Sequence, residues 1–172
     1  MTDRMTDTAG LRRFNALPEP EARQLLETCA AVPRWAEQVA AGRPYTDVQA
    51  TLQAARTAAD PWTDAEVDAA LSRHPRIGER PTGADAESAH SRREQAGVDP
   101  ADADLARQLA EGNRAYEERF GHVFLIRAAG RSAAEILQAL HTRLDNDPDT
   151  ERRIAAAQLR EIALLRLEQA LT

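Results

Sequence analysis

The feature that most constrains this fold is the lack of strand-forming runs in a chain rich in helix-forming residues. Aromatic residues make up only 4% of the sequence, and runs of β-branched residues are missing, although strands are enriched in both classes. Ala, Leu, Glu, Arg and Gln, which have high helix propensity, dominate instead. We therefore expect an all-α, single-domain bundle of about eight helices that are joined by short loops.

Local start and stop signals place these helices. Thr63 and Glu66 form one capping box and Ser132 and Glu135 form another, because in each pair hydroxyl and carboxylate can satisfy the first helical N–H groups reciprocally. Asp99 before Pro100 is expected to be an N-cap, and Gly121 is expected to end the helix that follows. The expected helices span roughly residues 18–30, 33–41, 46–59, 63–73, 85–96, 100–120, 132–144 and 149–171.

Composition excludes several classes of partner. The chain has 172 residues and a net charge of −6, and it contains no basic block of the kind that binds nucleic acid. Its single cysteine, Cys29, excludes an internal disulfide and a zinc site built from several cysteines. No apolar run approaches a membrane span, the N-terminus lacks a signal-peptide pattern, and the C-terminus lacks a peroxisomal signal. We expect a soluble cytoplasmic protein.

Residues 72–97 contain the residue types best suited to catalysis. His74 precedes Pro75, which disfavours a helical backbone at His74 and so ends the preceding helix there. A histidine at this position can act as a general acid or base. The alternative is a structural C-cap, in which the imidazole binds backbone carbonyls; position alone leaves both open.

Ser91, Glu94 and Gln95 are spaced i, i+3 and i+4, so one helix face presents a hydroxyl, a carboxylate and an amide. The same spacing also fits a solvated helix face. His90 and Glu94 could bind a metal at i, i+4, but two ligands are too few and no third is apparent. We therefore expect no metal site.

Two later segments could complete a pocket. Arg166 lies in an apolar stretch of the last helix, where a guanidinium needs an anionic partner. It could grip a substrate, form an internal salt bridge, or extend its head towards water. The segment HVFLIR at 122–127 could be a buried connector, or it could line a pocket and offer its backbone groups to a ligand.

These pieces together resemble the family of 2-oxo-4-hydroxy-4-carboxy-5-ureidoimidazoline (OHCU) decarboxylases of urate degradation. The resemblance covers about residues 11–171 and leaves residues 1–10 as a tail outside the expected domain of residues 11–172. The motifs that carry it are FNALPEPEARQLLETC (14–29), HPRIG (74–78), SRREQAG (91–97), NRAYEERFGHVFLIRAAGRS (113–132) and ERRIAAAQLREIALLRL (151–167).

The resemblance implies a carboxy-lyase that converts OHCU to (S)-allantoin without a cofactor and forms a homodimer. It implies that His74 and Glu94 are catalytic; we favour His74 as proton donor, with the opposite assignment left open. Arg166 would grip the substrate, with Arg160 as the alternative. The implied substrate-binding residues are Pro75, Ser91, Gln95, Val123, Phe124, Leu125, Ile126 and Arg166.

Two functions from other classes remain as alternatives. A non-catalytic helical adaptor would present an exposed apolar groove instead of a small polar pocket. A metal-dependent hydrolase would use His74, His90 and Glu94 as ligands and would contain bound metal.

Overall fold

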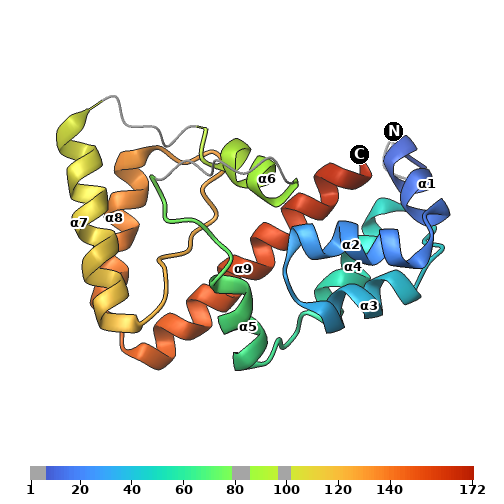
Figure 1. Ribbon diagram of the computed structural model, residues 1–172, viewed down its shortest axis with the longest axis horizontal. Coiled ribbons are helices and arrows are strands. Elements are labelled where there is room, and N and C mark those ends of the chain that lie inside the picture. The colour runs from blue at the N-terminus through green and yellow to red at the C-terminus, as the bar shows by residue number, and fades with distance from the viewer. Residues whose placement is uncertain (1–6, 79–85, 97–101) are drawn as a thin grey trace. The chain divides into compact units, whose positions relative to one another are not determined.

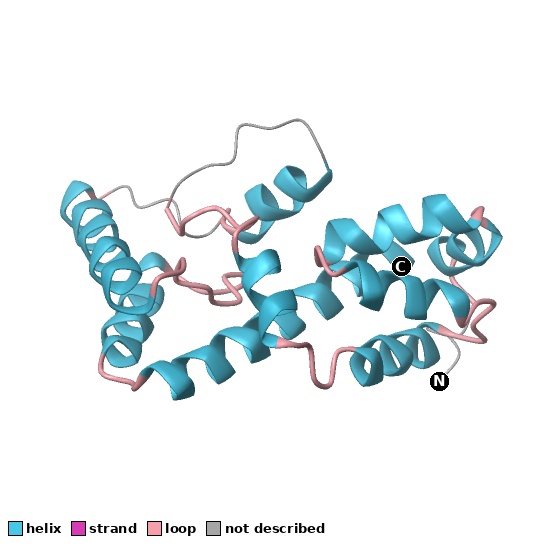
Figure 2. Ribbon diagram, turned by 60° about the horizontal axis from the view of Figure 1, so that its bottom comes forward, coloured by secondary structure: helices cyan, strands magenta, loops and turns pink. Residues whose placement is uncertain are grey.

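The computed structural model describes residues 7–78, 86–96 and 102–172, and every regular element within these ranges is a helix (Figure 1). The all-α expectation is therefore confirmed, and only helices and loops are drawn in Figure 2 for this part of the chain. None of the described helices is long and apolar enough to cross a membrane. The nine helices of the described residues are α1 (Ala9–Ala16), α2 (Glu19–Cys29), α3 (Pro33–Ala41), α4 (Val48–Ala58), α5 (Asp64–Leu71), α6 (Ala86–Glu94), α7 (Ala103–Phe120), α8 (Ala133–Leu144) and α9 (Pro148–Leu171).

The local signals in the sequence place most helix ends correctly. The N–H of Glu66 donates to the Thr63 hydroxyl at 3.1 Å, and the N–H of Thr63 donates to the Glu66 carboxylate at 2.9 Å, which completes the capping box of α5. The Ser132 hydroxyl caps α8. Gly121 ends α7 with φ of +78°, a left-handed conformation that glycine adopts without strain.

Two helix starts differ from expectation. The first is α1, which the sequence analysis did not predict; the Thr8 hydroxyl caps it, and Leu11 and Phe14 are buried on one of its faces. The expected boundary of a terminal tail at residue 10 falls within this helix. The second is α7, which begins at Ala103 with Asp102 as its N-cap; the expected cap, Asp99, lies outside the described residues.

The chain divides into two compact units, which are described separately. The first unit comprises residues 1–70 and 160–172. Within it α2 packs against α3, and α3 packs against α4. Trp35 is fully buried, and its indole N–H donates to the Ala55 carbonyl at 2.9 Å. This bond satisfies the one polar group of a large core side chain.

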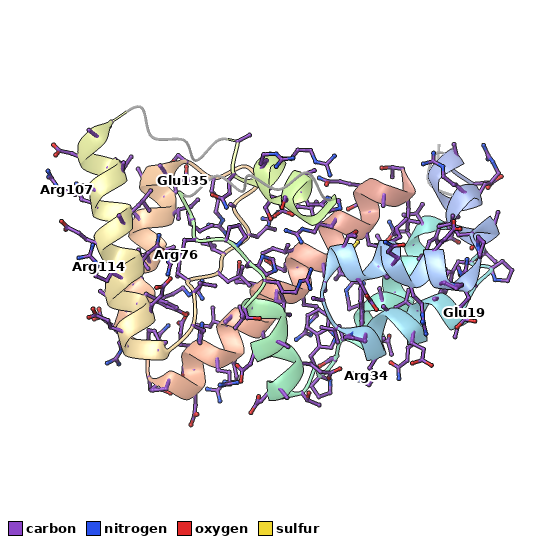
Figure 3. The ribbon with its side chains drawn as sticks, in the orientation of Figure 1. Glu19, Arg34, Arg76, Arg107, Arg114 and Glu135 are labelled. Atoms are coloured by element: carbon purple, nitrogen blue, oxygen red, sulfur yellow. The ribbon has the colours of Figure 1, made fainter. Side chains whose placement is uncertain are left out.

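The second unit comprises residues 71–159. Its α7 packs against α8 around a core that also includes residues of the 122–128 connection. The core residues are Ile77, Leu109, Tyr116, Phe124, Ile126, Ala128, Ala133, Ile136, Leu137 and Leu140. Charged side chains such as Arg76, Arg107 and Arg114 are exposed on this unit (Figure 3).

Candidate functional site

His74 lies immediately after α5, in the second unit. The helix ends at Leu71, slightly earlier than expected, and the His74 N–H still donates to the Leu71 carbonyl at 3.1 Å. Pro75 then prevents the helical turn from continuing. Both His74 and Pro75 are partly exposed.

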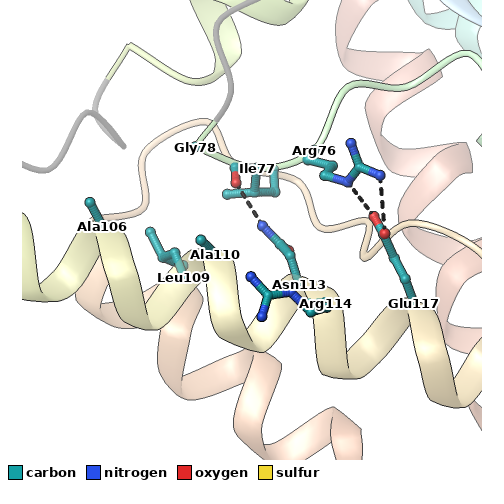
Figure 4. Close-up of a pocket in the computed structure, with 9 residues that line it drawn as sticks. All are labelled: Arg76, Ile77, Gly78, Ala106, Leu109, Ala110, Asn113, Arg114 and Glu117. Carbon is teal, nitrogen blue, oxygen red and sulfur yellow. Dashed lines mark hydrogen bonds and ion pairs between the residues drawn. The ribbon is translucent and has the colours of Figure 1, made fainter.

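The loop that follows His74 is fixed to α7 by side chains from both sides (Figure 4). The Asn113 amide donates to the Ile77 carbonyl at 2.9 Å, in a buried position. The Arg76 guanidinium makes a two-point ion pair with Glu117, at 2.6 Å and 3.2 Å. These bonds hold the backbone of residues 76–78 in place and thereby restrict the chain just beyond Pro75.

Ser91 and Glu94 lie on α6, and Gln95 lies in the turn that follows it. Ser91 is 3% exposed, whereas Arg92 and Arg93 are exposed, so the alternative of a fully solvated face does not describe Ser91. Glu94 and Gln95 are partly exposed.

The two motifs HPRIG and SRREQAG meet through one side chain. The Gly78 N–H donates to the side-chain oxygen of Gln95 at 3.1 Å. Gly78 has φ of +93°, a conformation that side chains rarely adopt. The bond uses the Gln95 acceptor oxygen and leaves its amide N–H groups for another partner. The loop after His74 and the end of α6 are therefore joined within one unit.

Residues 123–126 connect α7 to α8 without regular secondary structure. Phe124, Leu125 and Ile126 are buried, whereas Val123 is partly exposed. Because the Phe124 and Ile126 side chains belong to the core, burial supports the connector interpretation for those two. The backbone groups of these residues do not pair within a helix, so they need other hydrogen-bond partners.

A buried charged cluster beside this segment was missed by the sequence analysis. The Arg143 guanidinium donates from Nε to Glu151 at 2.7 Å and from Nη1 to the Leu125 carbonyl at 2.6 Å. Glu151 is fully buried and also accepts hydrogen bonds from the Tyr116 hydroxyl and, at 3.1 Å, from Asn146. The available signal was Arg143 itself, because it falls three residues after Leu140 on the apolar face of α8.

The same cluster changes the acidity of Tyr116. Burial raises the pKa of its hydroxyl well above the usual value of 10.0, and the hydrogen bond to Glu151 and the negative charge of Glu151 raise it further. The hydroxyl therefore remains a hydrogen-bond donor over the whole physiological range.

Arg166 and Arg160, the alternative candidate for gripping the substrate, belong to the first unit. Arg166 is 1% exposed, and its Nη1 donates to the Thr28 carbonyl at 3.3 Å. Arg160 lies 3.7 Å from the Asp60 carboxylate. The role of Arg166 as a substrate ligand stays a prediction, as does the choice between the two arginines.

His90, which the sequence analysis considered as a metal ligand, contacts an arginine. His90 Nδ1 lies 2.7 Å from Nη2 of Arg93. Among the described residues, no group of three His, Cys, Asp or Glu side chains is arranged to hold a metal ion.

A cavity of about 300 Å³ lies between the loop after Pro75 and α7 (Figure 4). None of the predicted site residues is among its described lining residues. The cavity lies on the side of the loop that contacts Asn113 and Glu117 of α7. The lining residues are Arg76, Ile77, Gly78, Ala106, Leu109, Ala110, Asn113, Arg114 and Glu117.

Comparison with protein families gives a match over nearly the whole chain. Residues 15–168 match the family model described as OHCU decarboxylase. This range includes His74, Glu94 and Arg166, so all the residues expected to carry the chemistry lie within the matched part.

Curated relatives support the same family. The uric acid degradation bifunctional protein TTL of Arabidopsis thaliana is 32% identical over 149 residues, which are 82% of this chain and 44% of that protein. The 2-oxo-4-hydroxy-4-carboxy-5-ureidoimidazoline decarboxylase of Amia calva is 40% identical over 67 residues, which are 39% of this chain and 38% of that protein. The chain thus spans less than half the length of these curated relatives.

Solved structures share the fold. An OHCU decarboxylase crystallised in the presence of (S)-allantoin has a TM-score of 0.69 at 30% identity, and the match covers 83% of this chain and 94% of that one. An (S)-allantoin synthase also has a TM-score of 0.69, at 16% identity, and covers 94% of this chain and 54% of that one. At this lower identity the likeness shows the fold alone.

Proposed function

The chain belongs to the OHCU decarboxylase family, and on this premise we propose that it decarboxylates 2-oxo-4-hydroxy-4-carboxy-5-ureidoimidazoline to (S)-allantoin in urate degradation. The observation that carries the proposal is the family match over residues 15–168. The hydrogen bond between Gly78 and Gln95 supports it, because it joins the two motifs that hold His74 and Glu94.

For this reaction the protein needs only to position the substrate and to control the transfer of protons. The substrate carries its carboxylate and a hydroxyl on one ring carbon, next to a C=N bond. When the bond to the carboxylate breaks, its electron pair passes into this conjugated system and CO₂ leaves. The resulting enol-like species takes up a proton on one face, which sets the configuration of the product. Residues that orient the ring and deliver this proton are sufficient.

In the proposed site, His74 delivers the proton and Glu94 orients the substrate. Arg166 and Gln95 hold the ureido and ring carbonyl groups. Ser91, Pro75 and the segment 123–126 complete the pocket and exclude bulk water, so that the departing carboxylate is poorly solvated. The buried Ser91 and the buried side chains of Phe124, Leu125 and Ile126 are consistent with a site closed to solvent.

A direct assay tests this function. The unstable substrate is generated in situ, and the formation of chiral allantoin is followed by circular dichroism. The parent protein should accelerate the appearance of the (S)-enantiomer, and His74→Ala and Glu94→Ala should each slow it by at least ~100-fold. His141→Ala is the matched control, since His141 is exposed on α8. Parent-like rates in either site variant would contradict the assignment.

The product separates the two proton-donor assignments. If His74 is the donor, the residual product of His74→Gln should be nearly racemic, whereas Glu94→Gln should still give mainly the (S)-enantiomer. The reverse pattern would make Glu94 the donor.

The same preparations test the alternative functions. An adaptor would neither accelerate the reaction nor melt at a higher temperature with allantoin. A metal-dependent hydrolase would contain metal by elemental analysis and lose all activity in EDTA. A cofactor-free enzyme should keep its rate in EDTA.

A homodimeric assembly, which the family resemblance implies, and a cytoplasmic location complete the proposal. Light scattering after size-exclusion chromatography should give a mass near twice the 18.9 kDa of one chain. Cell fractionation should recover the protein with cytoplasmic markers.

A further inference from the structure

The segment 122–127 depends on side chains, rather than on a helix or sheet, to fix its backbone. It lies between α7 and α8 in the second unit, and buried backbone groups outside regular structure need partners elsewhere. Side chains from α8 and α9 hold the two peptide groups that flank Ile126. Arg143 on α8 donates to the Leu125 carbonyl at 2.6 Å, and Gln158 on α9 accepts from the Arg127 N–H at 2.9 Å.

The first anchor is itself rigidly held. Arg143 is 7% exposed and Glu151 is fully buried. The guanidinium lies 4.6 Å from the centre of the Phe124 ring, and its Nε donates to Glu151. Glu151 also accepts hydrogen bonds from Tyr116 and Asn146. Because donors from α7, α8 and the turn before α9 converge on one carboxylate, the Arg143 side chain has little freedom to move.

The two anchors together determine the direction of both peptide groups of Ile126. Among the described residues, the cis peptide bonds are Arg43–Pro44 and Asp60–Pro61, so the bonds on either side of Ile126 are trans. In a trans peptide the carbonyl and the following N–H point in opposite directions. The Ile126 N–H therefore points away from Arg143, and the Ile126 carbonyl points away from Gln158.

We propose that Arg143, Glu151 and Tyr116, together with Gln158, are positioning residues that present the N–H and carbonyl of Ile126 as a donor–acceptor pair to the substrate. This inference rests on the proposed function. The 2-oxo ring and the ureido group of OHCU each place an N–H beside a carbonyl, and a peptide donor and acceptor at one residue complement that pattern. Neither Arg143 nor Gln158 needs to touch the substrate.

Gln158 offers the cleanest test because it is partly exposed and accepts through a neutral oxygen. Gln158→Leu removes the acceptor, while Gln158→Glu keeps it. We expect Gln158→Leu to lower kcat/KM about tenfold, chiefly through KM, and Gln158→Glu to restore it to within about twofold. Gln138→Leu is the matched control, since Gln138 is exposed on α8.

Arg143→Lys and Tyr116→Phe test the second anchor. A lysine keeps the positive charge but cannot donate in parallel to Glu151 and the Leu125 carbonyl. We expect Arg143→Lys to reduce kcat/KM by at least ~10-fold and Tyr116→Phe to reduce it by a smaller factor. If Arg143→Lys fails to fold, Tyr116→Phe and the Gln158 pair carry the test, since they leave the ion pair in place.

Amide hydrogen exchange separates positioning from general stability. Gln158→Leu should speed exchange at residues 126 and 127 while exchange in α2 and α3 stays at the parent rate. Parent-like kinetics in Gln158→Leu, or a kinetic loss that Gln158→Glu does not rescue, would overturn the inference. Lack of decarboxylation by the parent would reject the proposed function instead, and unchanged exchange at residues 126 and 127 would reject positioning whether or not the parent is active.

Discussion

The side-chain oxygen of Gln95 accepts a hydrogen bond from the backbone N–H of Gly78 at 3.1 Å, across a sequence separation of 17 residues. This bond joins the loop after His74 to the turn at the end of α6. Under the proposed function Gln95 therefore has two separable tasks, because the oxygen holds the loop while the amide N–H groups would bind the substrate.

Substitution at Gln95 should separate these tasks. Gln95→Glu keeps an acceptor for Gly78 but loses the amide donors, so we expect a nearly unchanged melting temperature and a rise in KM of at least ~10-fold. Gln95→Ala loses both, and should also lower the free energy of unfolding by about 1 kcal/mol. Steady-state kinetics and urea unfolding measure the two effects. A parent-like KM in Gln95→Glu would show that the amide does not bind substrate.

Gly78 and Gly130 form a matched pair for testing the loop after His74. Both are exposed, both have positive φ (+93° and +78°), and a Cβ at either would meet no atom within 4 Å. Alanine at each should therefore cost a similar ~1 kcal/mol of conformational strain. Only Gly78→Ala should also reduce kcat/KM, because only that loop leads to Pro75 and His74. Equal activity in the two variants, measured with equal stability losses, would argue that this loop does not position the site.

Structural features that depend on neighbouring residues were predicted from the sequence, and contacts between residues farther apart in the chain were not. The capping box at Thr63, the N-cap at Ser132 and the glycine stop at Gly121 are local signals, and the structure confirms them. The pairing of Arg143 with Glu151 was not predicted, since it depends on how the turn between α8 and α9 brings these two residues together across a separation of eight positions.

The candidate site shows the same division. The motifs HPRIG and SRREQAG can be recognised in the sequence, but the contact between Gly78 and Gln95 cannot, because these residues are 17 positions apart and no local rule pairs them. Spacing alone also left open whether Ser91 faces solvent, whereas the structure shows this residue to be 3% exposed.

Glu66 should give the first unit a measurable dependence on pH. The Arg34 hydrogen bonds, at 2.9 Å and 3.0 Å, hold the pKa of the Glu66 carboxyl below its usual 4.5, and the bonds with Thr63 lower it further. A carboxyl whose pKa is lower in the folded state stabilises that state above its unfolded pKa, and this contribution is lost as pH falls through the folded value. Because the Arg34 side chain is 42% exposed, solvent screening keeps the contribution to about 0.5–1 kcal/mol at pH 7.

We therefore expect Glu66→Gln to lower the free energy of unfolding by that amount at pH 7, and the difference from the parent to shrink as the pH falls below 4.5. Urea unfolding at pH 7 and pH 3 measures it. Glu37→Gln, at an exposed position on α3, is the control. A difference that persists unchanged at pH 3 would show that the ion pair is not its source.

Gly10 should tolerate no side chain, because α1 passes directly over the end of α9 within the first unit. A Cβ at Gly10 would lie 2.5 Å from the backbone carbon of Leu171, and backbone cannot yield as a flexible side chain can. The Thr8 hydroxyl also donates to the Leu171 carbonyl. We expect Gly10→Ala to force the two helices apart and to lower the free energy of unfolding by about 1–3 kcal/mol in urea titrations. Arg13→Ala, which changes an exposed side chain on the same helix, should stay within ~0.5 kcal/mol of the parent. If Gly10→Ala proves as stable as Arg13→Ala, residues 7–10 behave as the terminal tail that the sequence suggested, and α1 does not pack against the end of α9.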